Sequence, residues 1–127
     1  MAKVLIVDDE KGYRRYISAR LTRDGHTVET AATAADGINV GVAFGPDLLI
    51  VDWMLENGDS GFRVANALHE RNPELKTIFI TGFSAERVLQ ESGGLPIFRC
   101  IEKPFDTDDL AAAVAEALVN GRRESGD

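Results

Sequence analysis

Cysteine, proline and long apolar stretches are scarce in this chain. Its 127 residues include four prolines and one cysteine, Cys100, so no intrachain disulfide can form. No apolar run approaches the length of a membrane-spanning helix, and residues 1–8 lack the longer apolar core of a signal peptide. We therefore expect a cytoplasmic protein that does not enter a membrane.

Basic residues are also in the minority. The chain has 14 Lys and Arg against 21 Asp and Glu, which gives a formal net charge of −7. An acidic surface repels phosphates, so direct binding to nucleic acid or to an anionic membrane is not expected. The hydrophobic content of 44% is sufficient for a core, and the length fits one domain.

Five short segments have the composition of β-strands. Three are continuous runs of apolar residues, as in strands that are buried on both faces of a parallel sheet. A fourth is less uniform, and a fifth alternates polar and apolar residues, which indicates an edge strand. In chain order they are residues 4–7, 27–30 (the edge strand), 48–51, 78–80 and 97–101 (the less uniform one).

Helical patterns separate these segments. The first helix carries Tyr13, Ile17 and Leu21 at helical spacing and ends at Gly25. The other four are expected from Thr33 through Ala35, Ile38 and Val42 to Gly45, from Ser60 to Asn72, from Ser84 to Gly93, and from Asp106 through Leu110, Val114, Ala117 and Leu118. Five strands that alternate with five helices predict a doubly wound α/β domain, with helices on both faces of a mostly parallel sheet.

Polar side chains follow four of the predicted strands. They are Asp8 and Asp9 after the first, Asp52 after the third, Thr81 after the fourth and Lys103 after the fifth. Ligands of doubly wound sheets bind at this carboxyl edge, so we expect one common site. Clustered acids require a hard cation such as Mg²⁺, and an aspartate can act as a nucleophile toward phosphorus. An ammonium and a hydroxyl can contact phosphoryl oxygens, so the set indicates phosphoryl transfer to a carboxylate.

In these segments the chain resembles the receiver domains of two-component response regulators, from Lys3 to about Gly121. The matching segments are VDDE at 7–10, LIVD at 49–52, ITG at 80–82 and EKPF at 102–105. The resemblance implies a flavodoxin-like, five-stranded parallel sheet in the order 2-1-3-4-5. It also implies a receiver domain over residues 1–121, followed by a polar C-terminal tail over residues 122–127.

The resemblance further implies roles for individual residues. Asp52 would be the phosphoacceptor, and Thr81 and Lys103 would contact the phosphoryl group. The ligands of Mg²⁺ would be Asp8 (mainly through a metal-bound water), Asp9, Asp52 and the backbone carbonyl of Met54. The bond between Lys103 and Pro104 is expected to be cis, an isomer that proline makes accessible.

Partners are implied in the same way. A sensor histidine kinase or a phosphotransfer protein would supply the phosphoryl group, and a downstream protein or output domain would respond. We expect that target to dock on the face formed by the fourth helix, the fifth strand and the fifth helix. The chain would not be an enzyme, and it would be a monomer or a phosphorylation-dependent dimer. If it is a piece of a longer protein, the output or kinase domain lies outside it.

Three positions depart from the family pattern. Glu56 stands where a proline is common, four residues after Asp52, and the segment 54–61 is one residue longer than usual. Cys100 replaces an aromatic residue that commonly lies three positions before the lysine. We therefore expect the switch to operate mainly through Thr81, the loop 82–84 and the short fourth helix.

Two other functions are compatible with the sequence. A Mg²⁺-dependent phosphohydrolase would also form an aspartyl-phosphate, but it usually has a second acid two residues after the nucleophile. Met54 occupies that position and cannot transfer a proton. An interaction module without phosphorylation would keep only the fold. Trp53 is interpreted as partly exposed, either as a partner contact or as packing at the rim, and Cys100 as a buried strand thiol.

Overall fold

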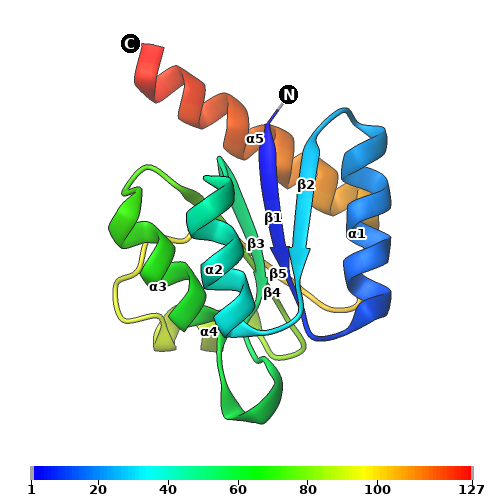
Figure 1. The fold of residues 1–127 in the computed structure, drawn as a ribbon, viewed down its shortest axis with the longest axis vertical. Coiled ribbons are helices and arrows are strands. Elements are labelled where there is room, and N and C mark those ends of the chain that lie inside the picture. Colours follow the sequence, from blue (N-terminus) through cyan, green and yellow to red (C-terminus); the bar gives the residue numbers. More distant parts are fainter. Residues whose placement is uncertain (1, 127) are drawn as a thin grey trace.

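The fold is one parallel sheet between two layers of helices (Figure 1). The computed structural model describes residues 2–126, and the side chains of residues 2–119. The strands are β1 (Lys3–Val7), β2 (Thr27–Ala31), β3 (Leu48–Asp52), β4 (Lys76–Thr81) and β5 (Arg99–Glu102). All neighbours are parallel, in the order β2-β1-β3-β4-β5. The predicted fold class, the strand order and the edge position of the second strand are confirmed.

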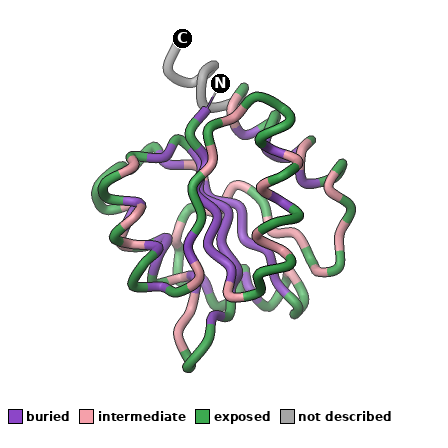
Figure 2. The backbone as a smooth tube through the Cα atoms, turned by 45° about the vertical axis from the view of Figure 1, so that its right-hand side comes forward, coloured by how far each residue is buried: buried purple, intermediate pink, exposed green. Residues whose placement is uncertain are grey.

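The helices divide between the two faces of the sheet. They are α1 (Lys11–Arg23), α2 (Ala34–Phe44), α3 (Gly61–Arg71), α4 (Ala85–Glu91) and α5 (Thr107–Gly126), with a 3-10 turn, η1 (Glu56–Gly58), before α3. Side chains of α1 and α5 pack on one face of the sheet, and side chains of α2, α3 and α4 pack on the other. The buried strands run through the centre of the molecule, as Figure 2 shows in purple. Alternate residues of each central strand therefore enter different cores.

Local signals in the sequence explain where the helices start and stop. The hydroxyl of Thr33 accepts a hydrogen bond from the backbone N–H of Asp36, and that of Ser84 accepts one from the N–H of Arg87. Both are N-caps of the expected kind. Gly25 has a φ of 96°, the left-handed conformation that was predicted at the end of α1.

The inward face of α2 differs from the prediction. Of the residues in the predicted pattern, Ile38 is half-buried against the core, whereas Ala35 and Val42 are exposed; the buried residues of this helix are Ala34, Gly37 and Gly41. A Cβ atom on Gly41 would come within 2.6 Å of the end of the Leu68 side chain in α3, so any larger residue at position 41 requires Leu68 to move. The prediction relied on the spacing of apolar residues, whereas the close packing of α2 against α3 favours small residues on the inward face of α2.

Two further boundaries differ from the expected ones. The last strand begins at Arg99 instead of Ile97, although the N–H of Phe98 already donates a hydrogen bond to the carbonyl of Thr77 in β4. The helix α5 continues to Gly126, so the backbone of residues 122–126 is helical. The division of the chain at residue 121 stays a prediction. Among residues 2–126, none of the helices combines the length and apolar character needed to cross a membrane.

Candidate functional site

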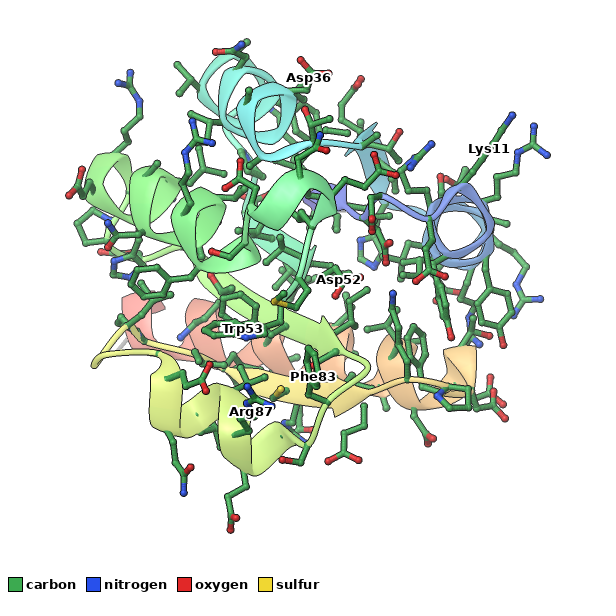
Figure 3. The ribbon with its side chains drawn as sticks, turned by 90° about the horizontal axis from the view of Figure 1, so that it is seen from below. Lys11, Asp36, Asp52, Trp53, Phe83 and Arg87 are labelled. Carbon is green, nitrogen blue, oxygen red and sulfur yellow. The ribbon has the colours of Figure 1, made fainter. Side chains whose placement is uncertain are left out.

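The carboxyl ends of four strands meet at one edge of the sheet. Asp8 follows β1, Asp52 is the last residue of β3, Thr81 is the last of β4, and Lys103 follows β5. Figure 3 looks onto this edge and shows Asp52 near the centre, with Phe83 on the side of α4. Parallel pairing brings these chain-distant residues together, as the sequence predicts.

Lys103 connects the acidic side chains. Its Nζ lies 2.7 Å from Oδ2 of Asp52, 3.1 Å from Oδ2 of Asp8 and 3.1 Å from Oε1 of Glu10. The Lys103 side chain is only 9% exposed, so this charge is held out of water. Burial lowers the pKa of the Lys103 ammonium, but the bond to Asp52 and the other nearby carboxylates raise it well above its usual value. The lysine therefore stays charged at neutral pH.

The two buried aspartates carry an electrostatic cost. Burial raises the pKa of Asp8 to about 6, and the charge of Asp52 adds to this effect, although the N–H of Glu10 and the ammonium of Lys103 oppose it. The pKa of Asp52 is also raised, mainly by burial and in part by the charge of Asp9, against the lowering effect of Lys103. One lysine does not compensate these acids, so the site favours an additional cation.

The acids are close enough to share such a cation. One carboxylate oxygen from each of Asp8, Asp9, Glu10 and Asp52 lies within 4.8 Å of the others. Oδ2 of Asp8 is buried and contacts the ammonium of Lys103 at 3.1 Å, but among the described residues no donor reaches it with regular hydrogen-bond geometry. Carboxylate oxygens are the ligands that Mg²⁺ prefers, so the donor set fits this ion.

Thr81 is fully buried at the end of β4, beside the acids. Its Oγ1 accepts a hydrogen bond of 2.9 Å from the backbone N–H of Phe83. A hydroxyl that accepts this bond still has its own proton to donate. The loop that follows is therefore tied to a hydroxyl at the same edge of the sheet as the acids.

The loop after Asp52 is held from both ends. Met54 and Ser60 form an antiparallel bridge around η1, and Leu55 is buried beneath it. The turn uses left-handed conformations at Asn57 (φ 64°) and Gly58 (φ 75°). The altered segment is thus an ordered turn, and it leaves the Met54 side chain 46% exposed at the rim of the site.

The surroundings of three residues near the site became clear only from the structure. Trp53 is buried, not partly exposed, because its indole packs edge-on against Phe79 and Phe62. Glu10, whose role the sequence did not decide, pairs with Lys103. The ring of Tyr13 lies over Lys103, although its spacing in the sequence suggested only a core contact. Its position one helical turn after the acidic segment is the signal that could have placed it here.

Cys100 is half-buried in β5, as a structural thiol would be. Burial and the nearby Glu102 raise the pKa of the thiol to about 11, so it is not a reactive thiolate at neutral pH. The cis bond expected between Lys103 and Pro104 is present.

Comparison with known proteins gives consistent results. A family profile described as "Response regulator receiver domain" matches residues 4–115. The chain is 31% identical to the photosynthetic apparatus regulatory protein RegA of Rhodovulum sulfidophilum, over 93% of this chain and 62% of RegA. It is 27% identical to the sporulation initiation phosphotransferase F of Bacillus subtilis, over 91% of this chain and 93% of that protein. The chain thus spans less than two thirds of RegA but most of the phosphotransferase.

Solved structures share the architecture. A CheY-like response regulator receiver domain protein from Methanospirillum hungatei has a TM-score of 0.90 and 27% identity, with 98% of each chain covered. The response regulator protein TrrA of Thermotoga maritima, solved in complex with Mg²⁺-BeF, has a TM-score of 0.81 and 26% identity, covering 92% of this chain and 99% of that one.

Proposed function

This chain belongs to the response regulator receiver domain family, and on that basis we propose that Asp52 is its phosphoacceptor. The observation that carries the proposal is the set of contacts around this carboxylate. It lies at the end of β3, it is bonded to Lys103, and it shares the edge of the sheet with Asp8, Asp9 and Thr81. The domain would act as a switch in a two-component system.

The proposed reaction moves one phosphoryl group. A carboxylate oxygen of Asp52 attacks the phosphorus atom of a phosphohistidine, the bond between phosphorus and the imidazole nitrogen breaks, and that nitrogen keeps the electron pair. Lys103 places a positive charge beside the attacked phosphoryl group, and the hydroxyl of Thr81 donates a hydrogen bond to a phosphoryl oxygen. No proton needs to leave Asp52, because its carboxylate is the reactive form.

The metal ligands are part of the proposal. Asp9, Asp52 and the backbone carbonyl of Met54 would bind Mg²⁺ directly, and Asp8 mainly through a water. The ion would neutralise the acids and stabilise charge on the phosphoryl oxygens. Glu10 belongs to the same acidic cluster, but its side chain is 59% exposed and the family resemblance gives it no ligand role, so we do not count it as a ligand.

Signal output is proposed to pass through α4. When the hydroxyl of Thr81 turns toward a phosphoryl group, its bond to the N–H of Phe83 must change, and the loop 82–84 follows. Cys100 has no ring that could swing inward with it. Phe83 and Leu89 are exposed on this side, at 43% and 53%, so the face of α4, β5 and α5 is our proposed docking surface for the downstream target.

Partners and setting follow from the family. A histidine kinase or a phosphotransfer protein is the proposed donor, in the cytoplasm, and the domain would be a monomer or a phosphorylation-dependent dimer. The matched region spans only 62% of RegA, which is therefore longer than this match. By analogy, we further propose that an output domain acts together with this receiver domain. We keep residues 1–121 as the receiver domain and 122–127 as a polar tail. A phosphohydrolase role is disfavoured, because Met54 cannot act as an acid or base two residues after Asp52.

The test is the mass of the intact protein after incubation with acetyl phosphate and Mg²⁺. We expect the wild type to gain one phosphoryl group, and the matched variant Asp52→Asn to gain none. A chelator should abolish the gain. Equal labelling of both proteins would exclude Asp52, and rapid turnover of small phosphate esters would favour the phosphohydrolase.

A further inference from the structure

The ammonium of Lys103 has a neighbour that the acidic site does not explain. Its Nζ lies 4.1 Å from the centroid of the Tyr13 ring, in addition to its bonds with Asp52 and Glu10. A cation within about 6 Å of an aromatic face is attracted by the ring, and the attraction grows when water is excluded. Water is largely excluded here, because the lysine side chain is only 9% exposed.

The Tyr13 ring is itself supported by the segment that carries the lysine. Its centroid lies 5.5 Å from that of Phe105, two residues beyond Lys103, and the two rings are tilted by 35°. Tyr16, one turn further along α1, also contacts Phe105, at 6.3 Å. Of these two tyrosines, Tyr13 is the one whose ring is recorded over the ammonium.

We propose that Tyr13 is a positioning residue, whose ring holds the ammonium of Lys103 beside Asp52 while phosphoryl transfer takes place. The inference rests on the proposed function. Without a metal, the carboxylates supply most of the attraction on the lysine. A divalent cation at Asp8, Asp9 and Asp52 cancels much of that attraction, whereas an aromatic ring has no formal charge to cancel and is not a Mg²⁺ ligand. Tyr13 is thus the partner of Lys103 that metal binding leaves unchanged.

The first test is structural and needs neither metal nor phosphate. In nuclear magnetic resonance spectra of the chelated protein, the side-chain protons of Lys103 should be shifted upfield by the Tyr13 ring. The shift should persist in Tyr13→Phe, vanish in Tyr13→Leu and Tyr13→Met, and persist in Tyr16→Leu. If Lys103 resonances are the same in Tyr13→Leu and wild type, the ring does not hold the lysine and the inference is wrong.

The second test is kinetic, at saturating Mg²⁺ with acetyl phosphate as donor. We expect the maximal phosphorylation rate to fall by about 3- to 10-fold in Tyr13→Leu and Tyr13→Met, as the loss of one desolvated cation–π contact predicts. Tyr13→Phe should restore the rate to within about 2-fold, since it keeps the aromatic face. Tyr16→Leu, which removes a contact with Phe105 alone, should match wild type.

Three outcomes would overturn the inference. Tyr13→Leu could lose the ring shift and keep the wild-type rate, Tyr16→Leu could slow the reaction equally, or Tyr13→Phe could fail to restore it. Urea unfolding of each variant separates these results from loss of the fold. If wild type itself accepts no phosphoryl group, the proposed function fails, and the spectra alone then decide whether Tyr13 places Lys103.

Discussion

On one side of Asp52, the backbone of β3 lies directly against Gly61 of α3, whereas on the other side the loop after Thr81 has open space around Gly82. A Cβ on Gly61 would overlap the carbonyl oxygen of Asp52, and a Cβ on Gly82 would meet nothing within 4 Å. All residues of β3 are buried, while the four residues of β5 are exposed or half-buried. The site therefore has a packed wall (β3, α2 and α3) and a loose wall (the β4–α4 loop, α4 and β5).

This difference indicates which parts hold Asp52 and which parts can respond to it. Interiors at native density resist displacement, so the packed wall keeps Asp52, the proposed phosphoacceptor, in place. Segments with few buried contacts open at lower free energy, and the loose wall is of this kind. The following changes test that contrast, from the largest expected effect to the smallest.

The direct test replaces each of the two glycines. Gly61→Ala should destabilise the fold by roughly 4 kcal/mol, because the added methyl meets backbone that the hydrogen bond from Gly61 N–H to Trp53 O holds in place. Gly82→Ala should change the free energy of unfolding by less than about 0.5 kcal/mol. Urea denaturation measures both, and similar losses in the two variants would remove the distinction between the walls.

A second change tests how closely α2 packs against α3 within the packed wall. Gly41→Ala forces the Leu68 side chain to move and should cost about 2 kcal/mol, since a tightly filled contact tolerates little added volume. Gly12→Ala is the matched control in α1, where nothing lies within 4 Å of the added atom. It should be neutral or stabilising by up to about 1 kcal/mol, from helix propensity alone. Stabilisation by Gly41→Ala would contradict close packing of α2 on α3.

The third change removes a buried charge at the end of β1. In a chelating buffer at pH 7, Asp8→Asn should raise the free energy of unfolding by about 1 kcal/mol, because burial disfavours this carboxylate. Its pKa in the folded protein, about 6, lies above the ordinary 3.8. The folded state therefore binds the proton more tightly, and the contribution of Asp8 to stability falls as the pH rises from 3.8 to about 6, then stays constant.

Thermal unfolding across this pH range checks the sign. The stability difference between Asp8→Asn and wild type should grow between pH 4 and pH 6, and the control Glu70→Gln, at an exposed position, should show no such trend. Under the proposed function, excess Mg²⁺ reverses the order of wild type and Asp8→Asn, since an ion that binds the folded wild type stabilises it. A constant difference at all pH values would mean that burial does not raise this pKa.

The smallest effect is expected in the loose wall. Oε2 of Glu102 accepts a bond of 2.8 Å from the N–H of Ala85, at the start of α4. Glu102→Ala should lower the free energy of unfolding by about 0.5–1 kcal/mol and speed amide hydrogen exchange at the start of α4. Glu102→Gln keeps a hydrogen-bond acceptor, so its stability and exchange rates should be nearer to those of the wild type. Equal exchange in all three proteins would show that this bond does not hold α4.

The sequence predicted the framework of this site because its determinants are local. Runs of apolar residues identified the strands, Thr33 and Ser84 identified helix starts, and parallel pairing placed Asp52 and Lys103 at one edge. Features that depend on tertiary packing were less accessible. The burial of Trp53 depends on Phe62 and Phe79, which belong to other elements of the fold, and the inward face of α2 depends on how closely α3 approaches.

The roles of Tyr13 and Glu102 were missed for a related reason. Tyr13 has helical spacing with Ile17 and Leu21, so the periodicity explains it without any contact to Lys103. Glu102 precedes the lysine and faces outward on an edge strand, and its bond to Ala85 joins residues that are 17 positions apart. Periodicity assigns a residue to a face of its own element, but it does not identify the neighbour on that face.

The excess of acid over base in the site has a consequence for the order of events. Four carboxylates and one ammonium (Asp8, Asp9, Glu10 and Asp52 with Lys103) leave a formal charge of −3. A phosphoryl donor is itself an anion, so the bare site repels it, and a bound cation removes most of that barrier. Under the proposed function, the domain would therefore act as an AND gate, a logic element whose two inputs, here the cation and the phosphoryl donor, are both required. Because binding linkage is reciprocal, a phosphorylated form of the domain would in turn hold its cation more tightly.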